Sequence, residues 1–98
     1  MSAFSTSKAM SHALLLRADA YLNANDMNPN KALEDATKAA SIDHLHGRAY
    51  RIKADAYEAL GDVLKAMEAV EQWAGVNPLF MSKAKNELSR LLQIRNTR

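Results

Sequence analysis

The side chains closest to a catalytic or metal-binding pattern are the two histidines of Asp43-His44-Leu45-His46. Two imidazoles one residue apart hold a metal ion firmly only when a third or fourth ligand is clustered with them, and this segment supplies no such set. The chain has no cysteine, which excludes a thiolate zinc site, a cysteine nucleophile and a disulfide framework. It also lacks a glycine-rich phosphate loop, HExxH, GxSxG and a paired-carboxylate arrangement. We therefore predict a turn at this segment, and a protein without enzymatic activity, metal or cofactor.

The composition of the 98 residues, 48% hydrophobic and 24% charged, is typical of one small globular domain. Only three glycines and two prolines interrupt the chain, so nearly everything between these breaks is expected to be helical. No apolar stretch approaches the roughly 18 residues of a membrane helix, and the polar start MSAFSTSK lacks the centre of a signal peptide. We expect a protein of the cytoplasm or nucleus with no membrane association.

Charge is distributed unevenly along the chain, whose formal net charge is +2. From Ser82 onward the only acid is Glu87, and the bases are Lys83, Lys85, Arg90, Arg95 and Arg98. A basic final helix can attract an anionic partner or simply keep the protein soluble. Nucleic acid is the less favoured partner, because the aromatic platform on which single-stranded RNA bases usually stack is missing.

A repeated segment organises the rest of the sequence. LLRADAYLNAND begins at Leu15 and RIKADAYEALGD begins at Arg51, so ADAY returns with its tyrosine moved from Tyr21 to Tyr57. In both copies small and large residues recur at spacings of three and four, which predicts one apolar stripe per helix. An alanine within such a stripe lets two helix axes approach closely, so the repeat indicates paired helices.

Turn residues divide the chain into five segments of helical length. Gly61 can take the left-handed conformation that ends a helix, Asp62 can cap the next helix, and Asn25-Asp26 occupies the corresponding place in the first copy. The predicted helices span about residues 8–24, 29–41, 46–60, 62–74 and 78–95, after a flexible segment at residues 1–6.

These residues together resemble the tetratricopeptide repeat family, whose units are antiparallel helix pairs of about 34 residues. The matching residues are Leu14, Ala18, Tyr21, Asn25, Asp26, Ala32, Ala39 and Ile42 in the first unit, and Tyr50, Ala54, Tyr57, Gly61, Asp62, Ala66 and Pro78 in the second. The departures are His44 for the closing proline, Arg17 and Lys53 for leucine, and Trp73 for alanine.

The resemblance implies an all-α fold, a right-handed superhelical stack of antiparallel helix pairs with about five helices. One domain at residues 7–98 would hold a repeat at 11–46, a second repeat at 47–80 and a capping helix at 81–95. The residues expected to fix the capping helix onto the second repeat are Ala84, Leu88, Leu91, Leu92 and Ile94.

The resemblance also implies that one face of each unit's first helix lines a concave groove in which extended peptides bind. If Leu14 packs inward against Tyr21, helical geometry turns Leu15 onto that face. The predicted groove residues are His12, Leu15, Asp19 and Leu22 in the first unit, Arg48, Arg51 and Asp55 in the second, and Lys85 in the last helix.

Within this predicted site, Arg48, Arg51 and Lys85 would attract carboxylates, and leucines 15 and 22 would offer an apolar pocket. Asp19 and Asp55 could face the groove or pair with neighbouring bases, and the sequence leaves both interpretations open. We expect a non-catalytic adaptor or co-chaperone-like scaffold whose partner is another protein or peptide, with acidic segments favoured.

The alternative is self-assembly, or assembly with a larger subunit, through an exposed stacking face. Two repeats are fewer than the roughly three that are usually needed for stability, so a homo-oligomer would supply the missing contacts. The clamp with which one subgroup of the family holds chaperone C-terminal carboxylates is not matched, since Leu15, Leu16 and Ile52 fall at places of its polar residues.

Overall fold

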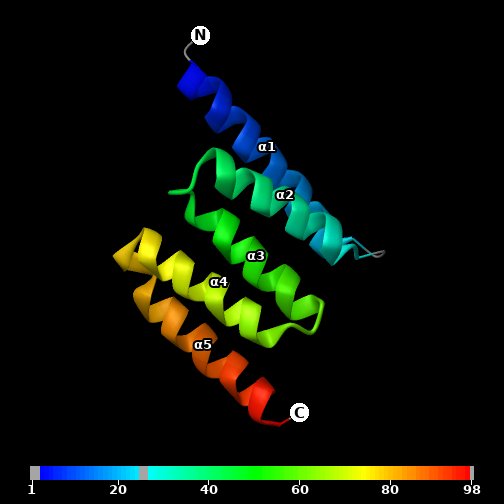
Figure 1. Ribbon diagram of the computed structural model, residues 1–98, viewed down its shortest axis with the longest axis vertical. Coiled ribbons are helices and arrows are strands. Elements are labelled where there is room, and N and C mark those ends of the chain that lie inside the picture. Colours follow the sequence, from blue (N-terminus) through cyan, green and yellow to red (C-terminus); the bar gives the residue numbers. More distant parts are fainter. Residues whose placement is uncertain (1–2, 25–26, 98) are drawn as a thin grey trace.

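The computed structural model describes residues 3–24 and 27–97, with side chains described from residue 7 onward. The described residues form five α-helices and one short 3-10 helix, and they include no strand. The elements are α1 (Ala3–Asn23), α2 (Pro29–Ile42), α3 (Gly47–Ala59), α4 (Val63–Val76), η1 (Pro78–Phe80) and α5 (Met81–Asn96). Figure 1 shows successive helices packed side by side in chain order, each antiparallel to the one before. The predicted all-α stack of helix pairs is therefore confirmed.

Short polar signals begin and end the helices where the sequence places them. The Asn28 side chain accepts a hydrogen bond from the backbone N–H of Lys31 at 3.2 Å, which caps α2 just before Pro29. Gly61 has φ 83°, and Asp62 accepts from the N–H of Lys65 at 3.2 Å, so the predicted left-handed turn and cap are both confirmed. The corresponding pair, Asn25-Asp26, lies outside the described residues.

Two helix boundaries differ from those predicted. Helix α1 begins at Ala3, so residues 3–6 of the segment expected to be flexible belong to a helix, while Met1 and Ser2 lie outside the described residues. The last segment is divided, because the side chain of Asn77 accepts from the N–H of Leu79 at 3.0 Å and the chain makes the 3-10 turn η1 before α5 starts.

The interior is built from small residues in two adjoining clusters. Seven alanines surround Leu15 and Ile52 in the first cluster, and the second is centred on Trp73, Val70 and Leu91. Ala18 and Ala54, the repeated alanines, are both buried, as expected where two helices approach closely. The repeated tyrosines are half-buried beside these clusters, so ADAY serves helix packing in both units.

The register of α1 corrects one predicted site residue. Leu15 is 0% exposed, whereas Leu16 is 51% exposed and Leu14 is half-buried. The buried stripe runs through Ser11, Leu15, Ala18 and Leu22, at spacings of four, three and four, and the Ser11 hydroxyl donates to the carbonyl of Ala39 at 3.4 Å. Leu15 is therefore a core residue, and its assignment to the groove was wrong. Leu22 is half-buried against the same cluster.

The large Trp73 fits between the second unit and the last helix because its neighbours make room for it. Its ring stacks on Phe80 with centroids 4.9 Å apart. A Cβ on Gly47 would lie 2.7 Å from Cε2 of Phe80 and 3.3 Å from Cδ1 of Trp73, so the absence of a side chain at Gly47 permits this arrangement.

Helix α5 covers the second unit as expected, with one exception among its predicted contacts. Ala84 and Leu91 are buried, and Leu88 and Ile94 pack against the second cluster. Leu92 is 43% exposed, because it lies about 100° around the helix from Leu91 and so turns away from α4.

Candidate binding face formed by α1, α3 and α5

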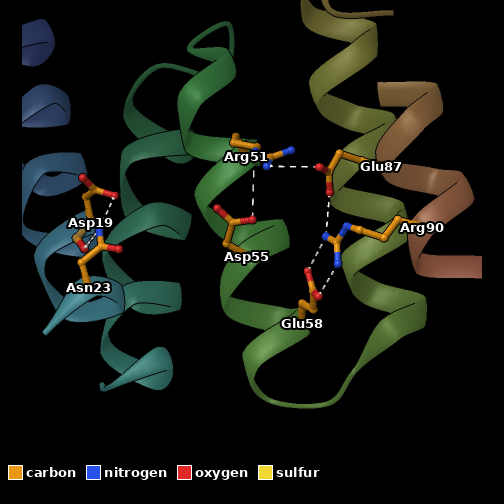
Figure 2. Close-up of polar contacts among 7 residues, drawn as sticks. All are labelled: Asp19, Asn23, Arg51, Asp55, Glu58, Glu87 and Arg90. Carbon is orange, nitrogen blue, oxygen red and sulfur yellow. Dashed lines mark hydrogen bonds and ion pairs between the residues drawn. The ribbon is translucent and has the colours of Figure 1, made fainter. Parts of the chain in front are cut away.

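The first helix of each pair and the final helix run in the same direction. The N-terminal ends of α1, α3 and α5 therefore lie along one edge of the molecule, at the left in Figure 1. Figure 2 shows side chains of all three helices arrayed along one face. We call this surface the A face. Of the residues predicted for a groove, His12, Asp19, Arg48, Arg51 and Asp55 retain exposed or half-exposed side chains. Lys85 is also exposed, but it lies about 160° around α5 from Glu87, which contacts α3, so its assignment to this face was wrong.

An ion-pair network joins α3 to α5 across the A face. Nη2 of Arg51 lies 3.4 Å from Glu87, and its Nε lies 3.7 Å from Asp55. Arg90 donates to both carboxylate oxygens of Glu58 at 2.6 and 2.7 Å, and to Glu87 at 2.7 Å (Figure 2). The positive charge of Arg51 is therefore already matched within the protein, which makes Arg51 a weaker candidate for binding a partner's carboxylate.

Sequence reasoning did not include Glu87 and Arg90 in the site. Their spacing of three residues was a usable signal for a pair on one side of a helix. The contact with Glu58, however, depends on how α5 is placed beside α3, and no local pattern specifies this.

Asp19 and Asp55 both pair with nearby bases, which is one of the two interpretations left open by the sequence. Asp19 accepts from the side-chain amide of Asn23 at 3.1 Å and from Arg48 at 3.4 Å. Asp55 lies beside Arg51, four residues earlier on the same helix. Both carboxylates remain half-exposed, so pairing does not remove them from the surface.

The pKa values of the three carboxylates in this ion-pair network shift in different directions. Hydrogen bonds from Arg90 lower the pKa of Glu58. Partial burial acts to raise the pKa of Glu87, but the hydrogen bond from Arg90 and the charge of Arg51 outweigh it and the pKa is lowered. Burial raises the pKa of Asp55, and the opposing charge of Arg51 does not fully offset it.

These opposite shifts predict opposite effects of two neutralising variants. Glu58, with its pKa lowered on folding, stabilises the fold above its unfolded pKa of about 4.3 and loses this effect as pH falls through the folded value. Glu58→Gln is expected to lower the free energy of unfolding by about 0.2–1 kcal/mol at pH 7 and to have no effect in acid. Asp55, with its pKa raised, disfavours the fold when ionised, so Asp55→Asn is expected to be neutral or stabilising at pH 7.

Urea denaturation of the wild type and both variants from pH 3 to pH 8 measures this difference. If Glu58→Gln and Asp55→Asn lowered the free energy of unfolding equally at all pH values, the opposite roles assigned to these two carboxylates would be contradicted.

A second feature of the A face is a pocket of 580 Å3 at the edge where α1 and α3 begin. We call it the basic pocket; its lining residues are Lys8, His12, Asp43, Leu45, His46, Gly47, Arg48 and Phe80. The side chain of Arg48 is 44% exposed, and its one ion pair among the described residues is the 3.4 Å contact with Asp19. Arg48 and His12 were predicted site residues, whereas the contributions of Phe80 and the α2–α3 turn were not.

The start of α3 adds to the positive potential of the basic pocket. His46 precedes the helix and its side chain makes no capping hydrogen bond. The first N–H groups of an uncapped helix carry a partial positive charge, and they favour an anion. Leu45, which is 68% exposed, and the half-buried ring of Phe80 give the same pocket an apolar part.

The neighbouring histidine, His44, has a structural role in the turn. Its carbonyl oxygen accepts a hydrogen bond from the Tyr50 hydroxyl at 2.7 Å. Within the described residues, no group of three or more histidine, aspartate or glutamate side chains is placed to hold a metal ion.

A smaller pocket of 390 Å3 lies between α3 and α5 and is lined by Arg51, Trp73, Lys83, Asn86 and Glu87. The Arg51 guanidinium is 5.2 Å from the centre of the Trp73 ring, a favourable cation–π distance. The bases Arg48, Arg51 and Lys83 lie near the starts of their helices, where the acids Asp43 and Glu87 also line the two pockets.

The architecture defines the class of protein to which the chain belongs, an all-α stack of helical hairpins closed by a final helix. No model of a known protein family matches the chain, and no curated protein has a significantly similar sequence. In residues 3–24 and 27–97 we find no helix whose length and apolar character would allow it to cross a membrane.

Proposed function

We propose that the protein is a non-catalytic interaction module of the tetratricopeptide repeat type, and that its basic pocket binds an acidic segment of a partner protein. The observation that supports this most directly is the gathering of Lys8, His12, His46 and Arg48 around one pocket at the uncapped start of α3. Asp43, the acid of the same lining, accepts a hydrogen bond from the N–H of Leu45 at 3.2 Å. A carboxylate entering this pocket would meet both charged donors and helix N–H groups.

The proposed site differs from the one predicted from sequence. Arg48 and His12 keep their predicted roles, while Leu45 and Phe80 replace leucines 15 and 22 as the apolar part. Arg51 instead stabilises the arrangement of α3 and α5, since Glu87 and Asp55 already compensate its charge. The partner segment would therefore bind at the edge of the A face where α1 and α3 begin. We also propose an adaptor role in the cytoplasm or nucleus.

Reversal of the Arg48 charge tests this proposal. Peptides would be selected from a displayed library of acidic 12-residue segments on the wild-type protein, and their dissociation constants measured by titration calorimetry. Arg48→Glu is expected to weaken binding by at least about tenfold, equivalent to about 1.4 kcal/mol, because it places a carboxylate opposite the ligand's own. Binding by the wild type should also weaken as salt is raised.

The matched control is Arg95→Glu, the same charge reversal at an exposed arginine near the opposite end of α5. This variant should bind within about twofold of the wild type, and circular dichroism should show equal helicity for all three proteins. Equal weakening of peptide binding by both variants would show that net charge alone accounts for the effect. Unchanged peptide binding by Arg48→Glu would show that the basic pocket is not the binding site.

A further inference from the structure

The outer side of α1 carries no charge where a solvent-facing helix would normally be most polar. Ala9, Ala13, Leu16 and Ala20 follow one another at spacings of four, three and four, on the side opposite the buried stripe. All four are exposed, Leu16 to 51%. We call them the outer stripe. It is an apolar surface that no other described part of the chain covers.

The order of residue sizes in the outer stripe makes it self-complementary. The spacing of four, three and four reads the same in both directions along the helix. A two-fold axis that passes between the two helices, perpendicular to them and level with the midpoint of residues 14 and 15, places Leu16 of one copy beside Ala13 of the other, and Ala9 beside Ala20. A large side chain then meets a small one twice, which lets two helices approach closely without a clash.

Charges beside the outer stripe are compatible with such a pair. Arg17 borders one side, and its guanidinium is held by both carboxylate oxygens of Asp35 at 2.7 and 2.8 Å. Its charge is therefore matched before a second copy approaches. On the other side, the same axis brings His12 of one copy toward Asp19 of the other. The two copies of Arg17 share one edge of the contact, where each is already paired with its own Asp35.

The opposite end of the stack is unsuited to pairing with α1. The outward side of α5 presents the exposed polar residues Ser82, Asn86, Ser89 and Gln93. Head-to-tail stacking of α5 on α1 would bury these groups against an apolar surface, with a cost for each hydrogen bond that is not replaced. Pairing of α1 with α1 buries apolar groups on both sides.

We propose that two copies of this chain associate through antiparallel contact of their outer stripes. One helix pair buries little area, so the dimer is weak and depends on concentration. The contact adjoins the basic pocket at His12, but Leu16 does not line that pocket, so Leu16→Glu tests the association without changing a residue of the proposed binding site.

Sedimentation equilibrium from about 10 μM to about 1 mM, the range suited to a small and weak interface, tests the association. The wild-type mass should rise from 10.8 kDa toward twice that value. Leu16→Glu should remain a monomer with unchanged helicity. The matched control is Leu64→Glu on α4, where the leucine is 55% exposed, and it should associate like the wild type. The proposal would be overturned if the wild type stayed monomeric, or if Leu16→Glu associated as strongly as the wild type. Loss of association in both Leu16→Glu and Leu64→Glu would overturn it as well.

The orientation can be tested separately because the chain has no cysteine. Ala13→Cys and Leu16→Cys proteins with different tags would be mixed and oxidised. Antiparallel pairing predicts that the mixed disulfide forms in excess over both symmetric ones. An excess of symmetric disulfides would instead require parallel pairing and overturn the proposed axis.

Discussion

Leu15→Ala is expected to lower the free energy of unfolding by about 2–5 kcal/mol, the usual loss when a buried leucine is truncated in a packed core. Leu15 is fully buried, and most of its neighbours in the first cluster are alanines. Alanine side chains have no rotamers with which to fill the space that a missing leucine would leave. A loss near the upper limit would be a large part of the stability of a domain of this size.

The next residue provides a matched control. Leu16 is half exposed on the outer stripe, so Leu16→Ala in dilute solution is expected to change the free energy of unfolding by less than about 0.5 kcal/mol. Urea denaturation followed by circular dichroism compares the two variants directly. Similar losses at both positions, or a larger loss at Leu16, would contradict the register of α1.

Trp73→Ala is the second change with a large expected effect, a loss of about 3–5 kcal/mol in the free energy of unfolding. The indole lies between the second unit and α5, stacked on Phe80 and covered by the guanidinium of Arg51. Its removal would leave a cavity beside Gly47, which has no side chain with which to fill it. The 390 Å3 pocket, which is lined by Trp73, and the basic pocket, which is lined by Phe80, would each lose part of their wall.

Trp73→Phe is the control for this prediction, because it keeps an aromatic ring against Phe80 and should lose less than half as much stability. Since Trp73 is the only tryptophan, unfolding must be followed by circular dichroism rather than fluorescence. A loss below about 1 kcal/mol for Trp73→Ala would show that α5 is held without the stacked rings.

The helices could be predicted because their signals are local. The cap at Asp62, the left-handed Gly61 and the alanines of ADAY each act within a few residues, and the structure bears out each of them. The register of α1 was harder, because three consecutive leucines fit two different apolar stripes. The correct stripe includes Ser11, and a serine is rarely predicted to be a core residue. Here burial is possible because its hydroxyl donates a hydrogen bond to the carbonyl of Ala39.

The candidate site was predictable only in part. Arg48 and His12 could be assigned from their helix faces, because the direction of a side chain on a helix follows from its position. The basic pocket also needs Phe80, which is 32 residues beyond Arg48, and it forms only when α1, the α2–α3 turn, the start of α3 and η1 come together. The compensation of Arg51 by Glu87 likewise depends on a contact between α3 and α5 that no local pattern contains.

The most direct test of the central claim is a titration of the isotopically labelled protein with the tightest acidic 12-residue peptide from the library, followed by two-dimensional NMR. The basic pocket predicts that the largest shifts occur at the backbone amides of His12, Leu45, Gly47, Arg48 and Phe80, and that they disappear in Arg48→Glu. Shifts confined to α2 and α4, or unchanged shifts in Arg48→Glu, would contradict the assignment of partner binding to this edge of the A face.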